Sequence, residues 1–167
     1  MRVLVTAASK HGATEEIGHA VVEELDRRGI VADFLTPEAV KSVTEYDAVV
    51  IGSAVYAGHW LKPATDLVEA HADDLRSRRG VWLFSSGPVG EPEPKPEGDP
   101  ADIDELVAAT SAKDHVVFGG RIKRDELGFA ERAIVRALRV ADGDHRDWVA
   151  IDAWAGTIAA SLVASGV

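Results

Sequence analysis

The chain opens with VLVTAASKHGATE at residues 3–15, an apolar run that passes through a loop of small residues into a helical pattern. Residues 3–7 are apolar or β-branched on both faces, which favours a parallel strand covered by helices on both sides. After Gly12, apolar side chains recur at helical spacing from Ile17 to Leu25, and Gly29 ends the pattern. This strand, loop and helix predict the first unit of an α/β fold.

The alternation of strands and helices continues to the C-terminus. We expect further strands at 31–35, 48–51, 81–84 and 116–120. Helical segments are expected at 37–40, 63–75, 102–110, 126–140 and from 148 onward. The 126–140 helix is predicted to bury Phe129, Ala133, Ile134 and Leu138, and Asp147 is a good N-cap for the last helix. Right-handed crossovers then predict an open α/β sandwich with the doubly wound strand order 2-1-3-4-5, which binds ligands beyond the carboxyl ends of its strands.

Length and composition bound the organisation of the chain. With 167 residues, 46% of them hydrophobic, we expect a single domain over 1–167. The stretch at about 86–101 is rich in proline and predicts a loop. Seven acids against one lysine between residues 91 and 105 concentrate much of the formal charge of −10 there.

Composition also excludes several classes of protein. The absence of cysteine excludes disulfides and thiolate metal sites, so any redox chemistry needs a bound cofactor, and we expect no metal. An acidic chain lacks the basic face that nucleic acids require. No apolar run reaches the roughly 18 residues of a transmembrane segment, and no signal peptide pattern is present, so a cytoplasmic location is expected.

The loop at residues 8–14 has the features of an anion site. It leads directly into a helix, so its backbone N–H groups and the helix dipole point at whatever binds there. Ser9 and Thr14 add hydroxyl donors, and Gly12 allows a close backbone approach. Because neither G-x-x-x-x-G-K-[ST] nor G-x-G-x-x-G is present, a monophosphate fits better than a P-loop or dinucleotide ligand. The alternative is that Ser9 and Thr14 only cap the helix.

Two further loops should meet the first at the same sheet edge. Residues 52–60 carry two glycines with Tyr56 and Trp60, and residues 85–90 are small enough for a planar ligand to approach the backbone. The alternative for the two aromatics is that they pack in the core.

Residues 3–15 resemble the FMN phosphate loop of flavodoxins, usually T/S-x-T-G-x-T, with His11 in place of the middle Thr. Residues 46–60, 119–122 and the helix start at 147–148 are similar to the short, menaquinone-linked, flavodoxin-like protoporphyrinogen IX dehydrogenases. The resemblance implies a flavodoxin-like three-layer sandwich with FMN at its switch point. It also implies that the phosphate contacts Ser9, Lys10, His11, Gly12, Ala13 and Thr14, that the isoalloxazine ring contacts Ala54, Val55, Tyr56, Ala57 and Gly58, and that its other edge meets Ser86, Gly87, Pro88, Val89 and Gly90.

By the same resemblance, the chain is expected to be an FMN-dependent oxidoreductase that passes electrons from a reduced small molecule to a quinone or another acceptor. No catalytic side chain is identified, although His11 and His59 are the candidates for acid–base work. Basic residues in and after the fifth strand could meet propionates or an anionic membrane surface, or could form a solvated helix face: Arg121, Lys123, Arg124, Arg132, Arg136 and Arg139.

Two other classes of function stay open from the sequence. One is a flavodoxin-type electron carrier that docks a basic redox partner protein through its acidic segment. The other is a flavin-free binding module. This alternative stays open because His11 replaces the middle Thr of the phosphate loop. Assembly into a homo-oligomer is also left open.

Overall fold

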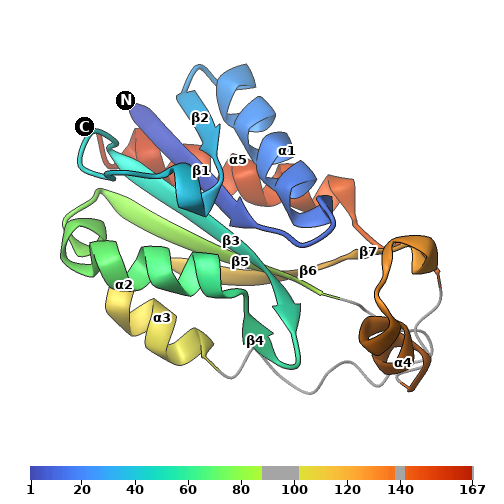
Figure 1. Cartoon of the computed structure of the whole chain (residues 1–167). Coiled ribbons are helices and arrows are strands. Elements are labelled where there is room, and N and C mark those ends of the chain that lie inside the picture. The colour runs from blue at the N-terminus through green and yellow to red at the C-terminus, as the bar shows by residue number, and fades with distance from the viewer. Residues whose placement is uncertain (88–101, 138–141, 167) are drawn as a thin grey trace.

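The computed structural model of the chain describes residues 1–87, 102–137 and 142–166 (Figure 1). Strands, helices and two 3₁₀ turns (η) follow one another along the chain. They are β1 (Arg2–Ala8), α1 (Ala13–Arg27), β2 (Val31–Leu35), η1 (Pro37–Ala39), β3 (Ala48–Tyr56), β4 (His59–Trp60), α2 (Lys62–Arg76), β5 (Gly80–Gly87), α3 (Ile103–Thr110), β6 (Asp114–Gly119), β7 (Arg121–Ile122), η2 (Arg124–Glu126), α4 (Phe129–Ala137), β8 (Gly143–Asp144) and α5 (Trp148–Ala164). Across the described residues, none of the helices combines the length and the hydropathy that crossing a bilayer requires.

The central sheet has the predicted order. Its five parallel strands run β2-β1-β3-β5-β6, which is the order 2-1-3-4-5 of the doubly wound fold. Helices α1 and α5 cover one face, and α2 and α3 cover the other (Figure 1). The α/β fold of the flavodoxin type is therefore confirmed.

The two faces of β1 explain its uninterrupted apolar sequence. Val3, Val5 and Ala7 are buried under α1 and α5. Leu4 and Ala8 are buried with residues of α2 and α3 on the opposite face. A strand covered on both faces cannot alternate apolar and polar side chains, so the pattern in the sequence follows from its central place in the sheet.

Helix α5 begins and packs as the sequence predicts. The Asp147 carboxylate accepts a hydrogen bond from the Ala150 N–H at 3.0 Å. The predicted apolar face is buried: Ile151, Trp154, Ala155, Ile158 and Leu162. The Trp154 ring lies 5.9 Å from that of Phe84 and 5.6 Å from that of Phe118, so this helix closes the core over the middle of the sheet.

Four strands are longer than predicted. β1 extends by one residue at each end, β3 runs to Tyr56 rather than ending at residue 51, β5 runs from Gly80 to Gly87, and β6 begins at Asp114 and ends at Gly119. Small polar side chains can continue a buried strand when they find partners, and Ser53 does so by accepting from the Leu61 N–H at 2.9 Å. Sequence periodicity alone could not show this pairing.

The short strand β4 was not predicted. It returns antiparallel on β3 through a turn in which Ala57 has φ 50° and Gly58 has φ 78°. Two consecutive positive φ angles are those of a type I′ turn, which joins the two strands of a tight hairpin. As a result, Ala54, Val55 and Tyr56 belong to a strand rather than to a loop.

The prediction for helix 126–140 is wrong about its start and its buried face. Residues 124–126 form η2, α4 begins at Phe129, and Phe129 is 93% exposed while Ile134 is 51% exposed. Ala133 is also exposed, and Leu138 lies outside the described residues. The buried positions are Glu131 and Val135. Val135 packs in a small cluster with Ile122 and Leu127, and the carboxylate of Glu131 has basic partners, so polar contacts rather than apolar periodicity orient the helix.

Residues 120–122 and 143–146 fold back on the sheet through very close backbone contacts. β7 and β8 form a two-stranded ribbon, and the His145 N–H donates to the Gly120 carbonyl at 3.0 Å. At Gly119 a Cβ would stand 2.1 Å from the His145 carbonyl oxygen. Only glycine leaves room for this approach.

We therefore expect Gly119→Ala to destabilise the protein by about 1–3 kcal/mol, because the backbone around His145 must shift to accept the methyl group. Gly128→Ala is the matched control, since its Cβ would meet nothing nearer than 3.8 Å. Urea unfolding of both variants checks this. Equal stability of the two variants would contradict the close approach.

Candidate functional site

The β1–α1 loop presents a row of backbone donors. Gly12 takes the left-handed conformation with φ +84° and serves as the N-cap of α1 without any side-chain cap. Within the described part of the chain, the N–H groups of residues 10–13 donate to no protein acceptor. Unpaired donors at a helix N-terminus attract an anion through hydrogen bonds and through the helix dipole. We call this row, with Ser9 and Thr14, the cradle.

The two hydroxyls of the cradle play different parts. Ser9 Oγ accepts from the Thr14 N–H at 3.3 Å, so the helix-capping alternative is correct for Ser9 in a weak form. The Thr14 side chain is 2% exposed, and its hydroxyl makes no hydrogen bond to the residues that the structure describes. Thr14 therefore offers the cradle a side-chain donor.

A carboxylate from α4 reaches the side chains of the same loop. Glu131 forms an ion pair with Lys10, and its Oε2 lies 3.2 Å from His11 Nε2 and accepts from the Gly128 N–H at 2.9 Å. The Lys10 ammonium also lies 5.3 Å from the centre of the Tyr56 ring. We call Lys10, His11, Glu131 and Tyr56 the Glu131 cluster.

The Glu131 cluster shifts two titrations. The hydrogen bond from Lys10, aided by those from Gly128 and His11, lowers the pKa of Glu131 to about 2 despite its burial. Burial, with a smaller contribution from the Glu131 charge, raises the pKa of Tyr56 to about 12. At neutral pH, Glu131 is therefore an anion and Tyr56 a neutral phenol.

Arg146 contacts the backbone of the cradle, and no sequence pattern predicted this role. Its guanidinium donates to the Ala13 carbonyl at 3.1 Å, to Glu16 at 2.6 Å and to Asp144 at 2.7 Å. Arg146 lowers the pKa of Asp144 to about 2. The Arg146 side chain is 3% exposed, whereas those of Glu16 and Asp144 are 47% and 42% exposed, so a buried guanidinium pairs with two partly exposed carboxylates. The one signal in the sequence was its place beside the N-cap Asp147, and that signal is weak.

Arg121 ties the β7–β8 ribbon to the same loop. It donates to Glu16 at 3.0 Å and to the His11 carbonyl at 3.3 Å. Lys123 pairs with Glu126 at 3.4 Å, and Arg139 lies outside the described residues. Part of the basic group from the sequence is therefore engaged within the protein rather than presented to a ligand.

The other two predicted segments lie beside the cradle. Strand register pairs Ala8 with Ser53 and Ala54 with Ser86, so the ends of β1, β3 and β5 adjoin one another. Ala57 and Gly58 form the exposed hairpin turn, and Gly87 ends β5. Pro88, Val89 and Gly90 lie outside the described residues.

Tyr56 and Trp60, the two aromatic residues of segment 52–60, lie in different environments. Trp60 is 5% exposed, and its indole N–H donates to Ser85 Oγ at 2.8 Å, so it belongs to the core beneath α2. Ser85 Oγ lies 2.8 Å from His115 Nε2 and extends this buried chain of contacts. Tyr56 is partly exposed at the end of β3, beside Lys10, and His59 is exposed on β4. Only Tyr56 remains an aromatic candidate for a ligand surface.

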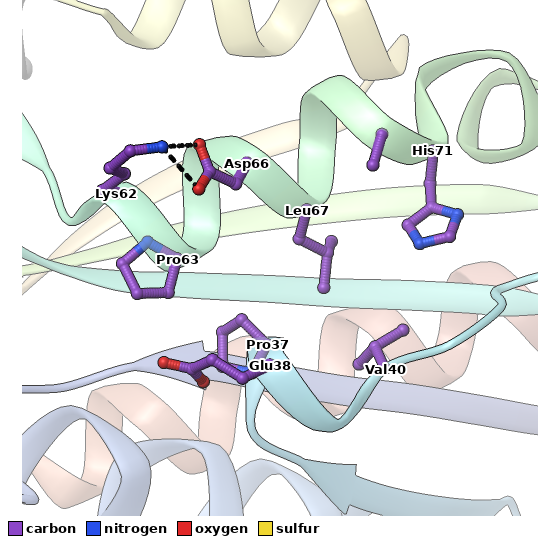
Figure 2. A pocket seen from close by; sticks show the side chains of 9 residues that line it. Pro37, Glu38, Val40, Lys62, Pro63, Asp66, Leu67 and His71 are labelled. Atoms are coloured by element: carbon purple, nitrogen blue, oxygen red, sulfur yellow. Dashed lines mark hydrogen bonds and ion pairs between the residues drawn. The ribbon is translucent and has the colours of Figure 1, made fainter.

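A groove in the described part of the chain lies away from the cradle. Figure 2 shows this groove of about 460 Å³ between η1 and α2, where Lys62 points to Asp66 and donates at 2.6 Å. No cradle residue lines it. The described residues also contain no cluster of His, Asp and Glu side chains fit to hold a metal ion. The chemistry of the cradle, rather than the size of a hollow, marks the candidate site.

Comparisons with known proteins bear on the family and the fold of the chain. A family model described as a flavodoxin domain matches residues 4–148. Over 95 residues, covering 56% of this chain and 52% of the relative, the sequence is 32% identical to an Escherichia coli K12 protein named protoporphyrinogen IX dehydrogenase (quinone). The matched region spans about half the length of the curated relatives.

Solved structures show the same fold at low sequence identity. Rubredoxin oxygen:oxidoreductase from Desulfovibrio gigas aligns with a TM-score of 0.69 and 13% identity, covering 98% of this chain and 36% of that one. A Streptococcus pneumoniae flavodoxin aligns with a TM-score of 0.64 and 20% identity, covering 96% of this chain and 99% of that one. These likenesses establish the fold alone.

The lowered pKa of Glu131 predicts its titration and a pH dependence of stability. The carboxyl should titrate near 2 rather than near 4.5, so its stabilising contribution is present above about pH 4.5 and is lost as the pH falls toward 2. Carboxyl NMR shifts followed against pH check this. In Lys10→Met the midpoint should rise toward 4.5, since the largest cause of the shift is removed. A midpoint near 4.5 in the unaltered protein would contradict the cluster.

Proposed function

The chain belongs to the flavodoxin domain family, and from that premise we propose that it binds FMN and uses it in electron transfer. The observation that carries the proposal is the cradle: four consecutive N–H groups at residues 10–13 without a partner among the described residues. Such a row at a helix start matches the oxygens of a phosphate group.

The residues present fit the phosphate end of FMN. Gly12 in its left-handed conformation has nothing within 4 Å of where a Cβ would stand, so the loop is open on that side. The Thr14 hydroxyl adds a donor to the backbone N–H groups. In the proposal, the cradle holds the phosphate by hydrogen bonds, and the Arg146 and Arg121 contacts hold the cradle itself in shape.

The ends of β3 and β5 fit the planar part of the cofactor. Ala54, Gly58, Ser86 and Gly87 have small side chains or none, which allows a ring close to the backbone. Tyr56 supplies a neutral aromatic surface, because a phenol is protonated at neutral pH and burial raises its pKa further, to about 12. When bound, FMN supplies reversible acceptance of electrons. The residues of the chain orient the ring and limit its contact with water.

Within this class, we propose an oxidoreductase that removes electrons from a reduced small molecule and passes them to a quinone or another acceptor. The support is the 32% identity to the relative named protoporphyrinogen IX dehydrogenase (quinone), over 56% of this chain. No side chain is assigned to acid–base chemistry, since the cofactor carries the redox step.

An electron carrier is the second candidate, and the net charge of −10 favours it. Acidic carriers dock basic partners through complementary charge. Ionic strength separates the two functions: a carrier loses its rate with a protein partner as salt rises, whereas oxidation of a small neutral substrate changes little.

The test is FMN binding and its dependence on the cradle. The purified protein should retain the visible absorption of oxidised flavin after FMN is added and the sample is desalted. Thr14→Val should weaken FMN binding by about tenfold through loss of one hydrogen bond to a charged group, measured by quenching of flavin fluorescence. Thr65→Val is the matched control, since that hydroxyl lies on the exposed side of α2.

A protein that stays colourless and quenches no flavin fluorescence would overturn both redox candidates together. A flavin-free binding module would then be the remaining function. If Thr14→Val and Thr65→Val lost equal FMN affinity, the protein would still bind FMN, but the cradle would not be its phosphate site.

A further inference from the structure

The cradle already has an anion beside it. Glu131 is 8% exposed, and its carboxylate contacts the side chains of Lys10 and His11. These are the two basic side chains of the loop that the proposed function gives to a phosphate. A phosphate and the Glu131 carboxylate would compete for the same two side chains, and the two anions also repel each other directly.

The contact divides the donors of the loop into two groups. The backbone N–H groups of residues 10–13 have no partner among the described residues, whereas the side chains of Lys10 and His11 are engaged by Glu131. The site is therefore open to hydrogen bonding but largely neutralised in charge. A phosphate in the cradle is fully attracted by the Lys10 ammonium only if the ion pair between Lys10 and Glu131 breaks.

Helix α4 is packed loosely enough to move away from the loop and break the contacts of Glu131 with Lys10 and His11. It stands outside the three layers, beyond the strand ends (Figure 1). Its apolar packing is a small cluster of Val135 with Ile122 and Leu127, separate from the two main cores. In the described part of the chain, the polar contacts between α4 and the β1–α1 loop are those of Glu131. The Gly128 N–H bond lies within the segment of α4 itself and would remain after release.

We propose that Glu131 is an internal competitor of the phosphate group: it occupies Lys10 and His11 in the free protein and leaves them when a phosphate-bearing ligand binds. The inference rests on the proposed function for the identity of the ligand. It makes Glu131 the residue that sets the affinity of the site for FMN. The opposite role, in which Glu131 positions Lys10 and His11 for the phosphate, predicts the opposite sign in the experiment.

The experiment compares FMN with riboflavin, which lacks the phosphate. In Glu131→Gln the dissociation constant of FMN should fall by about fivefold, because a repelling charge is removed while the shape is kept. Riboflavin affinity should stay within about twofold, since a neutral group feels little of that charge. Quenching of flavin fluorescence measures both.

Glu126→Gln is the matched control. It removes the same charge from the neighbouring η2 turn, where Glu126 is exposed and pairs with Lys123 at 3.4 Å, away from the loop. Its FMN affinity should equal that of the unaltered protein. Weaker FMN binding in Glu131→Gln, an equal gain for riboflavin, or an equal gain in Glu126→Gln would each overturn the inference.

A second measurement needs no variant and separates this inference from the proposed function. Inorganic phosphate is titrated into the unaltered protein, and the Glu131 carboxyl and the amides of residues 10–13 are followed by NMR. Saturable shifts at the carboxyl and at those amides support displacement. Shifts at those amides that leave the Glu131 carboxyl unchanged overturn it, as does a complete lack of response. Failure to bind either flavin would sink the FMN proposal, while the phosphate titration would still decide the role of Glu131.

Discussion

The burial of β1 on both faces is the constraint on which the rest of the structure depends. A central parallel strand must leave the sheet at its carboxyl end and cross over to a helix on one face. Here the chain turns from Ala8 into α1 within four residues, and Gly12 in the left-handed conformation makes that turn. So short a turn leaves its N–H groups unpaired at the start of a helix. The candidate site follows from the fold of β1 rather than from an added motif.

The neighbouring strands then decide what can reach those donors. β3 lies on one side of β1 and carries β5 next to it, so the ends of all three strands adjoin one another. Segment 120–146 adds two kinds of charge to this edge. Arg146 and Arg121 donate hydrogen bonds to backbone carbonyl groups of the loop. Glu131 instead forms an ion pair with the Lys10 side chain. The loop is thus held by two arginines that also pair with partly exposed carboxylates, and the Glu131 carboxylate lies against its side chains.

The sequence predicted those features that depend on local backbone conformation and on burial. Such features are the apolar runs buried on both faces, the N-cap at Asp147 and the glycine before α1. The predicted strand order and helix α5 rested on them and are confirmed. The patterns failed where tertiary contacts decide the outcome. Ser53 continues a strand because Leu61 reaches it, and α4 buries Glu131 rather than Phe129 because two basic side chains lie opposite. The role of Arg146 at the cradle could not be predicted from the sequence, because its contacts with Ala13 and Glu16 join residues 133 and 130 positions apart.

An amide NMR titration of the protein with FMN would show where the cofactor binds. We expect the largest shift changes on the amides of residues 10–14, with further changes at 54–58 and 86–87 where the ring would lie. Changes concentrated on the groove between η1 and α2, with the amides of the cradle unmoved, would contradict it. The cradle would then be only the turn by which β1 becomes α1.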